Sequence, residues 1–389
     1  MSYALSPVVK AVMSSPVTQA QAWLQGRKFP TAKPLLDIAQ AAPGYPPADE
    51  LNAYLAEQLR RPELSRYTGN FGIPELRAAL AEHMQDAYGG DISAQQVTIT
   101  AGCNQGFCTV VPALAAPGDE VMLPLPYYFN HQMWLELQGI RAVQLPFRDD
   151  ALPDPVAAAQ LISPRTRAIA LVTPNNPTGA VYPPDLLAAF YDLAERHGCA
   201  LILDETYKDF NEAPGPAHDL FQRPNWPEVL IQLYSFSKAY SLPGYRVGSV
   251  ISSTALIEQM AKIIDCVTIC PSRIGQEAAL FGLQHLSAWV ADKRQLMAQR
   301  RQALIDAFAA QDCGYQIVSS GAYFAYIRHP WPERSSVEVA QSLLEQQHIL
   351  CLPGAYFGPG QERYLRFAFA NLDAEQMPQL VTRLHASQS

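Results

Sequence analysis

Six short apolar segments constrain the fold of this chain more than any other feature of its sequence. They are short and nearly continuous in apolar character, which is typical of strands buried on both faces of a parallel sheet. The six predicted strands are Val97–Thr100, Val121–Leu123, Ala168–Val172, Ala200–Leu203, Val229–Leu233 and Val247–Ile251. Helical patterns lie between them, so we predict an α/β fold.

Two of the intervening helices are marked by their termini. Pro74 can occupy the first helical position, and Leu76 and Leu80 follow on one face of that predicted helix. A second helix is predicted over residues 184–197, and Gly198 stands where a glycine commonly ends a helix.

The C-terminal part of the chain has a different pattern. A long charged helix is predicted over residues 287–310 and one strand over residues 321–327, and Ser335 with Glu338 forms a capping-box pattern. We interpret this region as the main part of a second, α+β domain, which about the first 50 residues complete.

The charge balance and the cysteines exclude several classes of protein. The chain has 28 basic and 36 acidic residues, a formal net charge of −8, whereas nucleic-acid and anionic-membrane binders rely on basic patches. The sequence has no apolar stretch of the length, about 18 residues, that a transmembrane helix needs. Residues 1–30 lack the apolar core of a signal peptide, and the seven cysteines are scattered without a C-x-x-C pair. We therefore expect a reduced, cytoplasmic protein.

Motifs of several other enzyme classes are missing. No G-x-G-x-x-G follows a predicted strand and no G-x-x-x-x-G-K-[ST] occurs, which excludes a Rossmann dehydrogenase and a P-loop enzyme. There is no H-E-x-x-H or Cys/His cluster for a metal, and no G-x-S-x-G of a serine hydrolase. We expect no metal cofactor.

The residues around Lys238 give the first indication of chemistry. Lys238 follows a predicted strand, next to Ser235 and Ser237, and Arg246 comes eight residues later. A lysine kept uncharged by its surroundings can form a Schiff base with an aldehyde, and hydroxyls with an arginine fork suit a phosphate. Taken alone, Lys238 would be interpreted as an ordinary surface lysine after a strand, because lysines are usually surface residues.

Three other segments also follow predicted strands. Asn175–Gly179 has the composition of a turn, and Asp204 could cap a helix, bind a metal or pair with a protonated ring nitrogen. Gly102–Gly106 turns a strand into an apolar helix, whose first N–H groups form a natural phosphate cradle. Since binding crevices in open α/β sheets lie at the carboxyl ends of the strands, all four segments should meet. Their groups together meet the requirements of pyridoxal phosphate.

These segments resemble the fold-type I pyridoxal-phosphate enzymes of the class I/II aminotransferase family, to which aspartate aminotransferase belongs. The Ser-x-x-Lys-(x7)-Arg element, the Asn-Pro-x-Gly turn and the Asp-x-x-Tyr element follow the family's order, and the resemblance covers about residues 36–372. It implies a large domain with a mostly parallel seven-stranded sheet between helices, plus a smaller α+β domain. The predicted division is residues 1–50 for an N-terminal arm and part of the small domain, 51–285 for the large cofactor-binding domain and 286–389 for the small C-terminal domain.

The resemblance implies a role for each matched residue. Lys238 would form the Schiff base with pyridoxal 5'-phosphate and move the proton between the substrate Cα and the cofactor's C4′. Asp204 would pair with the pyridinium nitrogen. Asn176 and Tyr207 would hydrogen-bond the ring hydroxylate, and Asn176 would also contact the substrate. The phosphate would be held by Gly102, Cys103, Asn104, Ser235, Ser237 and Arg246.

Four further residues follow from the same resemblance. Tyr128 would stack on the cofactor ring, with Tyr127 as the alternative if the register shifts by one. Arg366 would bind the substrate's α-carboxylate as a fork, unless it is an ordinary salt-bridged arginine. Gly44 would let the N-terminal segment approach the substrate closely. Tyr67 would reach the phosphate of the neighbouring subunit, which implies a homodimer with shared active sites.

One position departs from the dicarboxylate-specific members of the family. In those enzymes an arginine from the partner chain binds the substrate's side-chain carboxylate, and that place falls at Asp265 here. An acid there would repel aspartate or glutamate, which argues against a pure aspartate aminotransferase. A solvated Asp265 is the alternative interpretation, and the nearby Arg273 could reverse the argument.

We predict an aminotransferase that moves an amino group from an L-amino acid to a 2-oxo acid by a ping-pong mechanism. The first alternative is a C–S β-lyase on the same scaffold, because the cofactor carries the chemistry and the site selects the bond that breaks. The second is a regulatory relative without turnover, which the acidic charge and the presence of all the key groups disfavour. We expect neither a nucleic acid nor a membrane as a partner.

Overall fold

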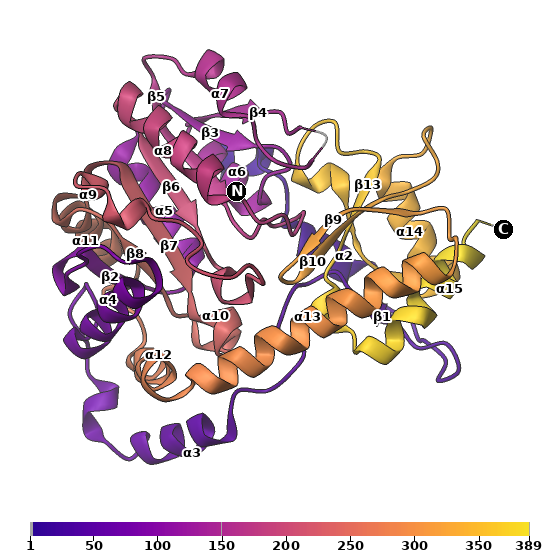
Figure 1. Cartoon of the computed structure of the whole chain (residues 1–389), viewed down its shortest axis with the longest axis horizontal. Coiled ribbons are helices and arrows are strands. Elements are labelled where there is room, and N and C mark those ends of the chain that lie inside the picture. The colour runs from indigo at the N-terminus through magenta and orange to yellow at the C-terminus, as the bar shows by residue number, and fades with distance from the viewer. Residues whose placement is uncertain (1–2, 149, 389) are drawn as a thin grey trace.

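The computed structural model describes residues 3–148 and 150–388. Figure 1 shows two parts side by side, one built around a seven-stranded sheet and the other around a four-stranded sheet. The long helix α13 (Ser287–Ala310) starts beside the large part and runs across the small part.

The large sheet has the strand order β2-β8-β7-β6-β5-β3-β4. Its strands are β2 (Val97–Thr100), β3 (Glu120–Pro124), β4 (Arg141–Leu145), β5 (Thr166–Val172), β6 (Ala200–Asp204), β7 (Leu230–Ser235) and β8 (Gly248–Ile251). Neighbouring strands are parallel except at β8, which is antiparallel to both β2 and β7. The predicted α/β fold with a mostly parallel seven-stranded sheet is confirmed.

Helices cover both faces of the large sheet, each over its own apolar cluster. One face carries α5 (Cys103–Leu114), α6 (Phe129–Leu137) and α11 (Thr254–Thr268). The other face carries α3 (Asp49–Gln58), α4 (Pro74–Tyr88), α7 (Pro155–Leu161), α8 (Pro184–His197), α9 (Trp226–Val229) and α12 (Arg273–His285). No helix in the described part of the chain is long and apolar enough to cross a membrane.

The two helices predicted from their termini are confirmed. α4 begins at Pro74, and its Leu76 and Leu80 are fully buried. α8 covers the predicted range and ends at Gly198, which has a φ of 63°. That left-handed conformation costs a glycine little, because glycine has no Cβ to collide with the backbone.

The small sheet is antiparallel, with the strand order β12-β13-β10-β9. Its strands are β9 (Gln316–Gly321), β10 (Phe324–Arg328), β12 (Leu352–Pro353) and β13 (Tyr364–Phe367), and α13, α14 (Ser336–Gln347) and α15 (Met377–Ala386) lie beside it. The predicted helix over residues 287–310 and the capping box of Ser335 and Glu338 are both confirmed.

The strand predicted over residues 321–327 is present as β10, but its predicted start at Gly321 is wrong. β9 ends at Gly321 and β10 begins three residues later, so Ala322 and Tyr323 form a tight turn between antiparallel strands. Ala322 has a φ of 48°, and a Cβ on Gly321 would lie 2.3 Å from the carbonyl oxygen of Gly179. The turn residues are buried against the large part and are apolar like the strand residues that flank them. In the sequence the whole segment therefore has the pattern of one continuous strand.

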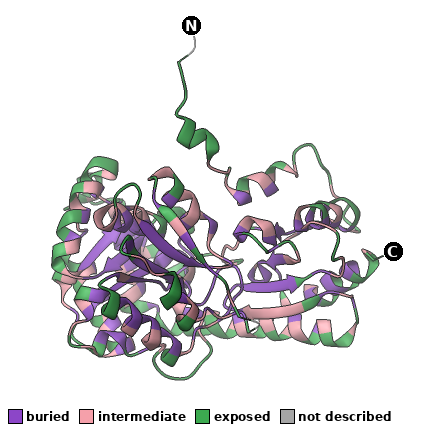
Figure 2. Cartoon of the chain, turned by 90° about the horizontal axis from the view of Figure 1, so that it is seen from above, coloured by how far each residue is buried: buried purple, intermediate pink, exposed green. Residues whose placement is uncertain are grey.

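The N-terminal residues lie against the small part. β1 (Leu36–Asp37) pairs in parallel with β11 (Ile349–Leu350), and Leu36 belongs to the apolar core beside the small sheet. α2 (Pro16–Ala22) buries Ala20, whereas α1 (Pro7–Ala11) has no buried residue. Figure 2 shows the first residues on an arm that extends away from the rest of the chain.

Candidate active site

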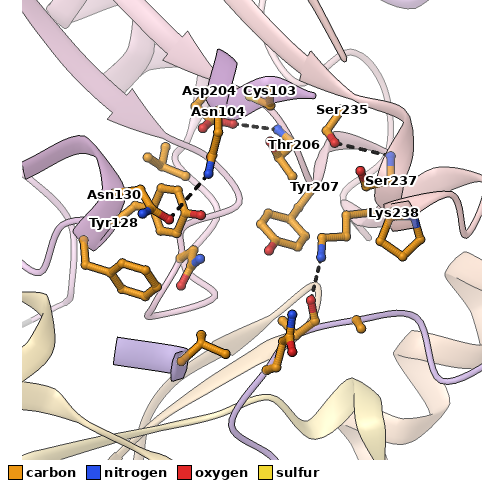
Figure 3. A pocket seen from close by; sticks show the side chains of 18 of the residues that line it. Cys103, Asn104, Tyr128, Asn130, Asp204, Thr206, Tyr207, Ser235, Ser237 and Lys238 are labelled. Carbon is orange, nitrogen blue, oxygen red and sulfur yellow. Dashed lines mark hydrogen bonds between the residues drawn. The ribbon is translucent and has the colours of Figure 1, made fainter. Parts of the chain in front are cut away.

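A cavity of about 450 Å³ lies at the carboxyl ends of β5, β6 and β7, where these strands face the N-terminal segment and β13. Figure 3 shows side chains from separate segments around it, as expected where parallel strands end at one edge of a sheet. Eleven of the fourteen predicted site residues line this cavity: Cys103, Asn104, Tyr128, Asn176, Asp204, Tyr207, Ser235, Ser237, Lys238, Arg246 and Arg366.

Lys238 lies on α10 (Phe236–Ala239), directly after β7. Its Nζ atom donates a hydrogen bond of 2.5 Å to the carbonyl oxygen of Ala41, drawn as a dashed line in Figure 3. The same atom lies 5.7 Å from the centre of the Tyr207 ring and 5.8 Å from that of Tyr323. The amine is therefore enclosed by two aromatic rings and one backbone oxygen.

This enclosure changes the acidity of Lys238. Burial, together with the positive charges of Arg366 and Arg246, lowers the pKa of Lys238 to about 8. An appreciable fraction of the amine is then neutral near neutral pH. A neutral lysine is a nucleophile and a base, and Lys238 lines the cavity instead of extending into solvent.

Asp204 ends β6 with its side chain buried. One carboxylate oxygen accepts a hydrogen bond of 3.0 Å from the backbone N–H of Thr206, and the other lies 3.5 Å from Nε2 of His131. Burial raises the pKa of Asp204. The hydrogen bond and charge of His131 and the hydrogen bonds of Thr206 lower it more, so this pKa lies below its usual value. The carboxylate stays ionised and can pair with a cationic group.

His131 is the main cavity neighbour that the sequence analysis missed. It lies on α6, one turn after Tyr128, and its ring stacks on that of Phe107 with the ring centres 3.8 Å apart. The spacing of three residues from Tyr128 was the available signal, because such positions share a helix face. A single buried histidine gives no indication of its partner in the sequence.

A second group of residues has the chemical composition of an anion site. Ser235 Oγ accepts a hydrogen bond of 3.3 Å from the N–H of Ser237, and α5 begins at Cys103, where its N–H groups are free of helical partners. Gly102 has a φ of 87°, and a Cβ there would lie 2.4 Å from Nη2 of Arg246. Only a glycine at that position lets the guanidinium approach the start of the helix. Hydroxyls, a guanidinium and helix N–H groups together suit a phosphate.

Arg366 on β13 is 2% exposed and lies against the rings of Phe324 and Phe357, 5.0 and 5.2 Å from their centres. It donates to Oδ1 of Asn176 at 3.0 Å and to the carbonyl oxygen of Ala39. Burial lowers the pKa of Arg366 to about 10, and its Nε has no hydrogen-bond partner. Its partners are neutral oxygens, so Arg366 differs from an ordinary salt-bridged arginine and can receive a carboxylate.

Two phenols complete the polar lining. Burial raises the pKa of Tyr207 well above its usual value and that of Tyr128 to about 12. Both hydroxyls therefore remain protonated and able to donate at neutral pH. Of the two neighbouring tyrosines considered from the sequence, Tyr128 lines this cavity, and Tyr127 lines a much smaller one beside it.

The remaining predicted residues do not line the cavity. A Cβ on Gly44 would lie 3.2 Å from both the carbonyl oxygen of Ala370 and Nη1 of Arg300, so Gly44 packs on the small part. Residues 40–42 line the cavity instead. Tyr67 is 78% exposed at a surface of the large part. Gly102 is in contact with the guanidinium of Arg246, which lines the cavity in its place.

Asp265 and Arg273 also lie outside the cavity. Oδ1 of Asp265 accepts a hydrogen bond of 3.0 Å from Asn70, and Arg273 forms an ion pair of 3.2 Å with Glu277 on its own helix. The charge of Arg273 is thus balanced locally. Asp265 is held beside the segment that carries Tyr67.

Comparison with known proteins identifies the family. The family model described as aminotransferase class I and II matches residues 31–384. Because the match spans most of the chain, the chain belongs to this family and is an enzyme of the aminotransferase class. The family predicted from the motifs is confirmed.

Individual relatives and solved structures agree with this assignment. An aspartate aminotransferase of Pyrococcus horikoshii is 30% identical over 79% of this chain and 79% of that protein. An aromatic aminotransferase of Arabidopsis thaliana is 29% identical over 90% of this chain and 88% of that protein. The structure of aspartate aminotransferase from Thermus thermophilus with maleate has a TM-score of 0.91 and 26% identity, covering 99% of this chain and all of that one (100%).

Proposed function

We propose that this protein is a pyridoxal-phosphate-dependent aminotransferase that transfers the amino group of an L-amino acid to a 2-oxo acid in two half-reactions. The observation that carries the proposal is the position of Lys238, whose pKa is lowered to about 8, in a cavity that also holds Asp204 and Arg366. A nucleophilic amine, a buried carboxylate and a guanidinium whose hydrogen-bond partners are neutral oxygens are the groups that this reaction needs.

The donors and acceptors of the cavity fit the cofactor group by group. Lys238 would hold its aldehyde carbon and Asp204 its ring nitrogen, while Asn176 and Tyr207 would donate to its ring hydroxylate and Tyr128 would cover its ring face. Its phosphate would be held by Ser235, Ser237, Arg246 and the N–H groups of Cys103 and Asn104, with Gly102 leaving room for the arginine. When bound, the cofactor supplies an electron sink for the bonds at the substrate's Cα.

The protein's own residues would bind and orient the amino acid. Arg366 would hold the α-carboxylate, because its Nε has no hydrogen-bond partner and its Nη atoms donate only to neutral oxygens, which a carboxylate could replace. Lys238 would move the proton at Cα, since its lowered pKa keeps it a base near neutral pH. Asp204 stays ionised beside His131 and would keep the ring nitrogen protonated.

The cavity wall next to the N-terminal segment supports substrates with uncharged side chains. Its residues are Ser15, Val17, Thr18, Gln40, Phe129 and Asn130, which are apolar or neutral. Asp265 would add a negative charge if a second chain brought it close, which further disfavours an acidic side chain. The alternative of a C–S β-lyase shares every cavity residue and is separated from transamination only by experiment.

We infer that the protein is a homodimer in a reducing compartment such as the cytoplasm. Tyr67, Val267 and Ile269 are exposed apolar residues, and the backbone N–H of Thr68 contacts Sγ of Cys270, which brings their two segments together. Ile269 has a φ of 63°, a strained conformation for a β-branched residue that surrounding contacts would have to maintain. All seven cysteines are free, in agreement with a reducing compartment.

The first experiment is to load the purified protein with pyridoxal phosphate and record its absorption spectrum before and after adding single L-amino acids. Conversion of the yellow form to the amine form by one class of amino acid would support transamination and name the donor. Release of ammonia and pyruvate from cysteine conjugates, without a 2-oxo acid, would instead support the lyase. A protein that cannot bind the cofactor would refute the proposal.

A further inference from the structure

The hydroxyl groups of Tyr45 and Tyr323 form a hydrogen-bonded pair next to the reacting lysine. Their oxygen atoms are 3.0 Å apart, and Tyr323 is fully buried. Neither residue lines the cavity, and neither is needed for any role described above. The pair joins segments that are far apart in the sequence, so it constrains the tertiary arrangement around Lys238.

Tyr45 ends the N-terminal segment that supplies backbone oxygens to the cavity. The carbonyl oxygen of Ala39 accepts a hydrogen bond from Arg366, and that of Ala41 accepts one from Lys238. The same short segment therefore contacts both Arg366 and Lys238. The proposed function assigns the amino acid's carboxylate to Arg366 and the chemistry at its amine-bearing carbon to Lys238. Any displacement of this segment would change the surroundings of both groups at once.

The segment is anchored at each end by side chains outside the cavity. Upstream, Nδ2 of Asn371 donates to the carbonyl oxygens of Asp37 at 3.1 Å and Gln40 at 2.6 Å. Downstream, Ser241 Oγ donates to the carbonyl oxygen of Tyr45 at 2.6 Å, which fixes the backbone, while the Tyr45 side chain reaches the small sheet. The tyrosine pair is thus the downstream link between this segment and the small part.

Tyr323 is a firm anchor because its turn is packed tightly on the large part. A Cβ on Gly179 would lie 2.4 Å from the backbone nitrogen of Gly321, so the two turns touch through their backbones. The Tyr323 ring also contacts that of Tyr207, with centres 5.5 Å apart, and faces Nζ of Lys238 at 5.8 Å. The Tyr45 hydroxyl, which is hydrogen-bonded to the hydroxyl of Tyr323, is therefore held at a fixed distance from Lys238.

We propose that Tyr45 and Tyr323 are positioning residues for the amino-acid substrate, acting through the Ala39–Ala41 segment. The hydrogen bond between their hydroxyls holds this segment in place. The segment then keeps the distance from Arg366 and Lys238 that the bound amino acid requires. This proposal rests on the proposed function of the cavity. It concerns substrate binding, and the cofactor should bind equally well with or without the pair.

The test compares Tyr323→Phe, Tyr45→Phe and the double variant with the unmodified protein, since each change removes a hydroxyl and keeps the ring. We expect each single variant to raise the KM for the amino acid about three- to tenfold, the size of one neutral hydrogen bond, with kcat and cofactor affinity changed less than about twofold. The double variant should show the KM of a single variant, because the two hydroxyls act as one unit.

Thermal unfolding separates positioning from a merely structural role. A single variant leaves one buried hydroxyl without a partner, whereas the double variant leaves none, so the double variant should recover much of the lost Tm. KM should stay raised in that double variant. A KM that returns to normal together with Tm, or single variants with an unchanged KM, would overturn the proposal. Tyr315→Phe is the matched control, because the Tyr315 hydroxyl pairs with that of Ser387 at 2.9 Å, away from the cavity.

A failure of the positioning proposal can be distinguished from a failure of the proposed function. Absence of transamination in the unmodified protein would refute that function, and it is observed before any variant is made. Positioning is then measured by calorimetric binding of an α-methyl amino acid, which keeps the carboxylate and amine but has no α-proton. The same three- to tenfold weakening is expected in Tyr323→Phe, and equal affinities would overturn the proposal.

Discussion

Nε2 of His131 lies 3.5 Å from Oδ2 of Asp204, and both side chains are buried, with Asp204 lining the cavity and His131 lining the smaller cavity beside it. The histidine approaches from α6 and the aspartate from the end of β6, so the pair joins the helical layer to the sheet. Without its partners, burial alone would raise the pKa of Asp204. His131 therefore helps to keep this carboxylate ionised.

The His131→Asn variant tests that relationship. Loss of the imidazole should raise the pKa of Asp204, because the largest opposing contribution to the burial effect is removed. The carboxylate then protonates at higher pH, so the acid limb of the kcat profile should move upward, with kcat lower by about tenfold per pKa unit on that limb. The measurement is kcat between pH 5 and 9. His329→Asn, a buried histidine of the small part, should leave the profile unchanged.

The pH dependence of cofactor binding tests the state of Lys238. Only the neutral amine attacks an aldehyde, and the pKa of Lys238 is about 8, against an ordinary value of 10.5. The rate at which the cofactor-free protein captures pyridoxal phosphate should therefore rise with pH to a midpoint near 8. A midpoint near that of a free lysine would contradict the enclosed site. Lys238→Ala should show no turnover, and borohydride should no longer fix the cofactor to the protein.

Replacement of Arg366 tests the carboxylate site. Arg366→Gln should raise the KM for amino acids about a hundredfold, because a charge-assisted bidentate contact is worth about 3 kcal/mol. Cofactor affinity should change little, since the arginine that we propose for the phosphate is Arg246. Steady-state kinetics and cofactor titration provide both numbers. Arg328→Gln, an exposed arginine on the adjacent strand β10, is the control and should behave as the unmodified protein.

A mixture of two defective variants tests whether Tyr67 serves the neighbouring subunit. Tyr67→Phe should weaken cofactor binding several-fold, and Lys238→Ala should be inactive. In a hybrid dimer, one site would combine an intact Lys238 from one chain with an intact Tyr67 from the other. Cofactor affinity at that site should return to normal if Tyr67 acts across the interface. If Tyr67 acts within its own chain, or if the protein is a monomer, mixing restores nothing.

Gly179 offers a stability prediction with a built-in comparison. Gly179 and Gly215 both have positive φ values, 74° and 83°, but a Cβ on Gly179 would lie 2.4 Å from the backbone of Gly321, whereas Gly215 has open space around it. Gly215→Ala should cost about 1 kcal/mol from backbone strain alone. Gly179→Ala should cost about 3 kcal/mol or more, because two backbone segments must separate. Urea unfolding of both variants measures the difference.

The strands and helices were predictable where burial pattern and local chemistry agree. The short apolar runs of β5 and β6 are typical of strands with both faces covered, and Pro74 and Gly198 mark helix ends through their own backbone preferences. The turn at Ala322 escaped prediction because a buried turn and a buried strand have the same composition. The predicted domain limits at residues 50/51 and 285/286 stay a prediction.

The candidate site was predictable only where residues are adjacent in the sequence or match a motif. Ser235, Ser237 and Lys238 share one strand end, so their spacing alone predicts that they act together. The roles assigned to these residues stay predictions. His131 was missed because its partner lies 73 positions further along the chain, at Asp204, and a separation of that length leaves no periodic signal.

The sequence by itself determined the sheet, most of its helices and the identity of the groups at the strand ends, because these depend on local burial patterns and on the backbone preferences of proline and glycine. Only the tertiary structure decided what surrounds each group. The lowered pKa of Lys238 arises from burial and from Arg366, which is 128 residues away, and the carbonyl oxygen that holds its amine belongs to Ala41. Desolvation and Coulomb interaction depend on distance in space, and chain folding alone sets that distance.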